Sequence, residues 1–148
     1  MKKEIVWMPL ILIAMFASAS VSTRAQTAYG VRADVPFDFI VGDKTIPAGH
    51  ITAQGVTSDM AGTLSIRNRD QGDLALRTGS RVPGTDDSDQ CKLVFHKYGN
   101  HYYLAQIWIP GRQAWEVMKS KEERSLEREM RSVKNFKPAP VILAARME

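Results

Sequence analysis

The feature that most constrains the fold is a pair of β-rich segments on either side of Gly99-Asn100. The segments KLVFHKY (92–98) and HYYLAQIWI (101–109) are rich in aromatic and β-branched residues. Gly at the first position of a two-residue loop is typical of a type II′ turn between antiparallel strands. We therefore predict a β-hairpin over residues 92–110.

The position of the turn also predicts which side chains share a face. With Tyr98 opposite His101, the pairs continue as far as Leu93 opposite Gln106. A slip of one residue would mix the two faces. The face that we expect in the core contains Leu93, Phe95, Tyr102, Leu104 and Trp108. The other face contains Val94, His96, Tyr98, His101, Tyr103 and Ala105.

Further strands are predicted elsewhere in the chain. Residues 31–41 alternate with period two, and Pro36, which cannot donate a ladder hydrogen bond, indicates an edge position or a bulge. Residues 50–56 and 141–145 are weaker strands, and residues 78–90 read as a polar loop. A second hairpin is predicted from 63–69 and 74–77 around a turn at 70–73. Its expected apolar face consists of Leu64, Ile66, Leu74 and Leu76.

One helix is predicted within residues 113–134, which contain no Gly or Pro and are rich in Glu, Lys and Arg. Ser120 and Glu123 have the spacing of a capping box, so we expect the regular helix at about 120–134. Its apolar stripe is narrow and consists of Leu126, Met130 and Val133. The helix is therefore expected on the surface against one edge of the sheet, with its mixed charges in solvent.

Together these elements predict a mainly β fold. We expect a single antiparallel β-sandwich or small β-barrel with one C-terminal surface helix, preceded by a signal peptide. A hydrophobic fraction of 44% and a charged fraction of 24% are typical of a globular domain. Residues 26–148 suffice for one domain, which can bury about two-thirds of its unfolded surface without a disulfide or metal.

Residues 1–25 have the pattern of a secretory signal peptide. Lys2 and Lys3 precede a 12-residue apolar run at 5–16, which is shorter than the ~20 residues of a membrane span. Small residues then allow cleavage after Ala19 or Ala25. We therefore expect an exported protein, periplasmic or extracellular, with no stable membrane insertion after cleavage of the signal.

Removal of this segment also changes the charge. Three of the 20 basic residues and one of the 16 acidic residues lie within 1–25, so the net charge falls from +4 to +2. The remaining basic residues form no concentrated stripe. We therefore expect no nucleic-acid partner.

Two motifs add a resemblance. The first is VPFDFIVG (35–42) followed by IPAG (46–49), and the second is KLVFHKYG (92–99) leading into YLAQIW (103–108). Together they resemble a group of small exported bacterial proteins of unknown function, with a VPFxFxVG…PAG opening and a KLVFHxYG hairpin. The resemblance covers most of residues 26–148 and implies an envelope or secreted β-rich domain, with Ile51 in place of the usual aromatic. Its motifs lie in turns and core positions, so it transfers no catalytic residue.

The predicted outer face of the 92–110 hairpin carries the most informative side chains. His96, Tyr98, His101 and Tyr103 would project together as a ligand or interaction face. His96 and His101 could share a metal, but two ligands fall short of a closed metal site, and an aromatic cross-strand ladder is the favoured interpretation. No cofactor is expected.

Other candidate groups are weaker. Asp86, Asp87 and Asp89 lack the spacing of a calcium loop and are expected in solvent. Cys91 is the only cysteine, so it forms no internal disulfide and is either inert or a link between two chains. Trp108 and Trp115 are expected in packing rather than in a ligand pocket.

No serine-nucleophile elbow, phosphate loop or metalloprotease helix is present in the sequence. The leading hypothesis is a non-enzymatic envelope structural or protein-interaction module, which would bind an envelope protein or a second copy through a strand edge or Cys91. The alternative is a lipocalin-like carrier of a small molecule in the periplasm. A third hypothesis, an enzyme, would require His50 or a carboxylate within ~3–4 Å of His96 or His101.

Overall fold

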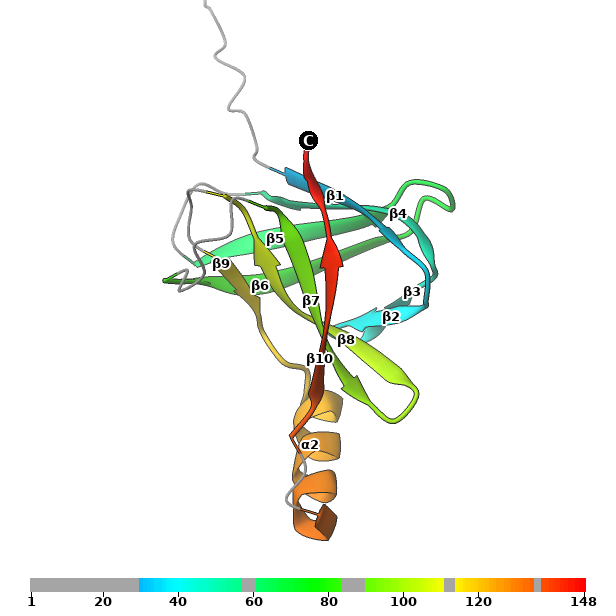
Figure 1. The fold of residues 1–148 in the computed structure, drawn as a ribbon, viewed down its shortest axis with the longest axis vertical. Helices are drawn as coiled ribbons and strands as arrows, with labels where there is room; N and C mark the ends of the chain where they lie inside the picture. Colours follow the sequence, from blue (N-terminus) through cyan, green and yellow to red (C-terminus); the bar gives the residue numbers. More distant parts are fainter. Residues whose placement is uncertain (1–29, 57–60, 84–89, 111–113, 135–136) are drawn as a thin grey trace, which may run out of the picture.

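The computed structural model describes residues 30–56, 61–83, 90–110, 114–134 and 137–148 (Figure 1). The predicted signal peptide at 1–25 lies outside the described residues. The first strands are β1 (Gly30–Val35), β2 (Phe39–Val41), β3 (Lys44–Ile46), β4 (Gly49–Gly55), β5 (Ala61–Asn68) and β6 (Leu74–Val82). They are followed by β7 (Lys92–Tyr98), β8 (His101–Trp108), β9 (Ala114–Val117), the helix α2 (Lys121–Lys134), β10 (Ala139–Ala144) and β11 (Arg146–Met147).

The strands form one sheet whose order closes on itself. The order is β10-β7-β8-β9-β6-β5-β4-β1-β11, and β10 and β11 are consecutive pieces of one segment separated by Ala145. This segment pairs antiparallel with β7 and then with β1, and Figure 1 shows it in red across the sheet. The predicted mainly β class is confirmed, and the closed order makes it a small barrel rather than a sandwich.

The barrel encloses a packed hydrophobic core. In β1, buried Val31, Ala33 and Val35 alternate with exposed Arg32 and Asp34, as the period-two pattern predicts. The rings of Phe39 and Phe95 meet edge to face with centroids 5.2 Å apart. The core also contains Val41, Ile46, Ile51, Ala53, Leu64, Ile66, Ala75, Cys91, Leu93, Leu104, Ile107, Ile109, Trp115 and Val117.

Pro36 divides the first predicted strand. β1 ends at Val35 and β2 begins at Phe39, because Pro cannot continue the ladder. Beyond the break, β2 pairs antiparallel with β3 and forms one parallel bridge to β8, between Ile40 and Tyr103. Phe37 lies in the break itself and stacks on Tyr102 at 4.0 Å between centroids.

The β7–β8 hairpin follows the predicted register near its turn and departs from it further along. Gly99 has φ 61°, and Tyr98 pairs with His101 as predicted. The predicted pairs hold as far as Phe95 opposite Leu104, but Val94 then pairs with Gln106 instead of Ala105. This bulge adds one residue to β8. Beyond it, the β8 side chains predicted to face the core point outward, and their neighbours point inward.

The bulge corrects the predicted core. Ile107 is 2% exposed and points inward, whereas Trp108 is only half-buried, so the assignment of Trp108 to the core is wrong. The outward indole nitrogen of Trp108 donates to Gln106 Oε1 at 3.0 Å, and the Lys92 ammonium lies 4.6 Å from the ring. A tryptophan at the rim keeps its polar nitrogen partnered in this way.

Two other predictions about the middle of the chain are also wrong. Leu76 is 62% exposed while Ala75 is buried, because Ala75 lies opposite the inward-facing Ile66 and opposed residues share a face. In addition, β6 continues through Val82 into the predicted loop. There it pairs with β9, whose residues fall at the start of the segment in which the sequence predicts a helix.

The helix itself is confirmed at Lys121–Lys134. Ser120 accepts a hydrogen bond from the backbone nitrogen of Glu123 at 3.0 Å through its Oγ, as expected of an N-cap residue. Figure 1 shows α2 extending past the end of the barrel at which β7 and β8 turn. Within the described part of the chain, no helix is long and apolar enough to cross a membrane.

Candidate functional site

The predicted His and Tyr face of the β7–β8 hairpin lies partly beneath α2. Tyr98 is 1% exposed and Tyr103 is 6% exposed, and their rings meet edge to face at 5.6 Å. The ring of His96 stands perpendicular to that of Tyr98 at 6.3 Å. His101 is exposed at the turn. The four residues are therefore divided between a covered aromatic row and an open end.

A buried carboxylate from α2 faces this row. Glu123 is 5% exposed, and its Oε1 lies 3.6 Å from Nδ1 of His96, an ion-pair distance that is longer than a hydrogen bond. Burial raises the pKa of Tyr98, and the negative charges of Glu123 and Glu127 add to this shift. The pKa of Tyr103 is raised in the same way, first by burial and then by Glu123.

This geometry places a carboxylate within the distance that the enzyme hypothesis required, but its chemistry favours attachment of the helix. A raised pKa keeps both phenols protonated, so neither Tyr98 nor Tyr103 is available as a base or nucleophile. Glu123 lies on the buried face of α2, against the hairpin, rather than in an open cleft. We interpret the pair of His96 and Glu123 as a polar contact that holds α2 on the hairpin.

A second charged group joins α2 to the segment that precedes it. The Lys119 ammonium donates to Glu127 Oε2 at 2.8 Å, and Arg131 pairs with Oε1 of the same carboxylate. The hydrogen bond from Lys119 is the largest influence that lowers the pKa of Glu127, against the opposing effect of burial. The side chain of Glu127 is only 12% exposed. A charge this well covered has to be paired, and here both neighbours are cations.

Beyond these contacts, α2 and the hairpin turn are separated by an apolar groove. Its volume is about 490 Å³. The helix contributes its whole apolar stripe, and Val133 at the outer end remains 73% exposed. The lining residues are Tyr98, Gly99, Asn100, His101, Leu126, Glu129, Met130 and Val133.

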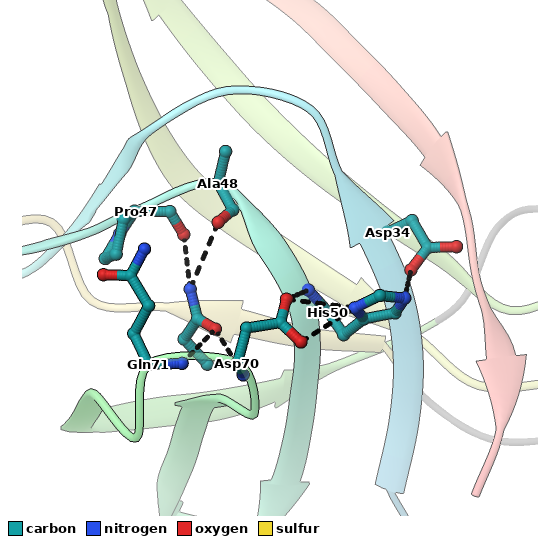
Figure 2. Close-up of polar contacts among 7 residues, drawn as sticks. Asp34, Pro47, Ala48, His50, Asp70 and Gln71 are labelled. Atoms are coloured by element: carbon teal, nitrogen blue, oxygen red, sulfur yellow. Dashed lines mark hydrogen bonds and ion pairs between the residues drawn. The ribbon is translucent and has the colours of Figure 1, made fainter.

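A second constellation lies on the outer surface of β1 and β4. Figure 2 shows the imidazole of His50 between two carboxylates, with Nε2 at 3.2 Å from Asp34 and Nδ1 at 3.0 Å from Asp70. Asp34 and His50 are paired across the ladder, and the backbone nitrogen of His50 also donates to Asp70 at 2.8 Å. The side-chain hydrogen bond with Asp70 is the main cause of a raised pKa for His50. The pKa of Asp70 is lowered, first by the backbone hydrogen bond from His50 and then by the hydrogen bond with its imidazole.

The arrangement of this group limits its chemistry. The two carboxylates approach opposite ring nitrogens, so they do not converge on one point where a cation could bind all three residues. Both nitrogens are also occupied, which leaves no free position for proton transfer to a substrate. Among the described residues, no group of three or more potential ligands is arranged to hold a metal ion.

The turn that carries Asp70 is held from below by a buried amide. Asn68 is fully buried, and its Nδ2 donates to the carbonyl of Pro47 at 2.8 Å while its Oδ1 accepts from the nitrogen of Asp70 at 2.9 Å (Figure 2). Gly49 lies directly beneath Asp70, where an added Cβ would stand 2.5 Å from Oδ2. Gly49 also has φ 148°, a backbone conformation that L side chains rarely adopt, so this position favours glycine.

The remaining predicted groups lie in packing positions or outside the description. Cys91 is 5% exposed in the core, and burial raises the pKa of its thiol. Trp115 is buried in the same core with Arg81 4.9 Å from its ring. Asp86, Asp87 and Asp89 lie outside the described residues.

Two features of these sites are not indicated by the sequence: Glu123 as the partner of His96, and the pair of carboxylates around His50. Asp34 lies within one predicted strand and His50 at the start of another, so the sequence places both in strands. Their pairing depends on the register between β1 and β4, which no local pattern specifies. Comparison with protein-family models, with curated proteins and with solved structures finds no match to this chain.

Proposed function

We propose that residues 26–148 form an exported, non-enzymatic protein-interaction module of the bacterial envelope, and that the groove between α2 and the hairpin turn is its binding surface. The observation that carries this proposal is the apolar stripe of α2, which extends past the barrel and lines an open groove, with Leu126 and Met130 half-buried and Val133 exposed. An exposed apolar groove of this kind is typical of a site for another protein.

The groove supports this proposal better than a strand edge does. β10 and β11 stand at the two ends of the strand order, yet they belong to one segment that pairs with β7 and β1. Closure of this kind reduces the edge available for β-augmentation. Buried Cys91 is also poorly placed to join two chains.

The carrier hypothesis receives no support from the interior. The inward-facing residues of the barrel form one hydrophobic cluster, and ring contacts such as that of Phe39 with Phe95 occupy its centre. A ligand carrier of this architecture needs an apolar cavity of several hundred Å³ inside the barrel. We therefore place the proposed activity on the outside of the molecule.

Site-specific cross-linking in the native envelope tests the proposal. A photoreactive phenylalanine replaces Val133 in the groove. A matched control protein carries it at Leu76, which is equally on the surface but lies on β6, outside the groove. We expect a discrete protein adduct from position 133 alone, lost on addition of Met130→Asp. Equal adducts from both positions, or none from position 133, would contradict the proposal.

Export is tested separately by fractionation and by the mass of the mature protein. We expect the protein outside the cytoplasm, with a mass that corresponds to cleavage after Ala19 or Ala25. A full-length cytoplasmic protein would overturn this part of the proposal.

A further inference from the structure

The charges around the groove are unevenly distributed. Among the described residues that line the groove, Glu129 is the only carboxylate, His101 is the only other titratable side chain besides Tyr98, and no Lys or Arg is present. Glu129 is exposed, and no ion pair to it is found in the described part of the chain. The groove therefore combines an apolar floor with a negative charge at its rim.

The helix places its positive charges elsewhere. Side chains that share a face of a helix recur every three or four residues, so Leu126, Met130 and Val133 form one stripe. By the same spacing, Arg124 and Arg128 lie on the opposite side of α2 from this stripe, where they line a separate surface depression. The cations of α2 whose side chains are described, Lys121, Arg124, Arg128 and Arg131, all line this depression rather than the groove.

Glu122 does not belong to this rim. It precedes Glu129 by seven residues, or two helical turns, but it lines the separate depression together with Arg124 and Arg128. Among the described residues that line the groove, the negative charge is therefore that of Glu129.

We infer that the groove binds a segment of another protein that presents apolar side chains flanked by Lys or Arg. The inference rests on the proposed function and adds the chemistry of the partner. The apolar residues of the segment would cover Leu126, Met130 and Val133, and one of its cations would pair with Glu129. Complementary charge at the rim of an apolar contact favours the correct partner and its rate of association.

A second copy of the chain fits this surface less well. If two α2 stripes packed antiparallel about a two-fold axis, Glu129 of one copy would approach the same flank of the other, and like charges oppose such a contact. An anionic lipid surface would meet the same negative rim. A basic and apolar protein segment is the occupant that the charges favour.

Two synthetic peptides test the inference on the full mature protein. Both are 14-residue amphipathic helices with identical leucine positions, and their polar positions are all Lys in one peptide and all Glu in the other. We expect the Leu/Lys peptide to bind at least about tenfold more tightly at low salt, with the difference reduced near 1 M salt, where the screening length is about 3 Å. Binding is measured by fluorescence anisotropy.

Charge reversal in the protein sharpens the test. We expect Glu129→Lys to weaken binding of the Leu/Lys peptide about tenfold, a change of about 1.4 kcal/mol. Glu116→Lys changes the net charge equally on an exposed residue of β9, outside the groove, and should leave binding unchanged. Circular dichroism confirms that each variant is folded.

The outcomes separate the inference from the proposed function. Equal or tighter binding of the Leu/Glu peptide overturns the inference. If Met130→Asp abolishes binding of that peptide, the proposed function of the groove as an interaction site still stands. Binding of neither peptide also overturns the inference, whereas the cross-linking experiment decides the proposed function independently. Self-association or binding to anionic vesicles that depends on Met130 would identify a different occupant and overturn it as well.

Discussion

The molecule contains two histidines that face carboxylates, and their surroundings differ. His96 lies against one buried carboxylate, Glu123, beneath α2. His50 lies between two carboxylates, Asp34 and Asp70, in full contact with solvent. Water screens the second group, so its charges contribute little to stability, while removal of a buried partner leaves a polar group without compensation. The number of ionic contacts in a region is therefore a poor guide to how much that region contributes to the free energy of unfolding.

The largest expected effect comes from the amide beneath the exposed group rather than from its charges. Asn68→Ala removes the partners of two carbonyls and two backbone nitrogens in a fully buried position. We expect a loss of about 3 kcal/mol in the free energy of unfolding, measured by urea denaturation. A loss below that of His50→Gln would show that the charged group, and not the amide, holds these turns.

A smaller effect is expected where the buried carboxylate holds the helix. Glu123→Ala leaves His96 and the hydroxyl of Tyr98 without their facing charge, so we expect a loss of about 2 kcal/mol. Glu122→Ala, one residue earlier and exposed, is the matched control and should cost less than about 0.5 kcal/mol. Similar losses for the two variants would contradict the assigned role of Glu123.

The smallest effect is expected at His50, and it depends on pH. Its pKa is raised above the ordinary value of 6.5 in the folded state, so the protonated form stabilises the fold fully below that value. The contribution disappears as pH rises through the folded pKa. His50→Gln should therefore lower Tm more near about pH 5.5 than near about pH 8.5, and high salt should reduce the difference.

A titration of the imidazole by NMR provides the direct measurement. We expect a pKa for His50 above 6.5 in the wild type and closer to the ordinary value after Asp70→Asn, because the hydrogen bond with Asp70 is the main cause of the shift. An unchanged pKa in Asp70→Asn would assign the shift to Asp34 instead.

Local patterns predicted much of the fold because they depend on neighbours in the chain. The alternation of Val31, Ala33 and Val35, the turn at Gly99 and the cap at Ser120 each involve contacts over a few residues. These features are decided by backbone geometry and by side-chain period, which a sequence carries directly.

The candidate site was less predictable because its contacts join distant elements. His96 was recognised on the outer face of the hairpin, but its partner Glu123 lies on the helix, 27 positions further along. The covering of Tyr98 and Tyr103 likewise depends on where α2 packs. No pattern in either segment specifies how one lies against the other.

The sequence by itself determined the strands near their turns, the helix and its cap, and the mainly β class, since each follows from local propensity and period. Only the tertiary structure decided the closure of the barrel by the C-terminal segment, the bulge that turns Ile107 inward, and the strand at 114–117. These outcomes depend on packing between segments far apart in the chain, where a shift of one residue exchanges buried and exposed faces. The groove beside α2 exists for the same reason: the barrel contacts one part of the helix and leaves the apolar stripe beyond it uncovered.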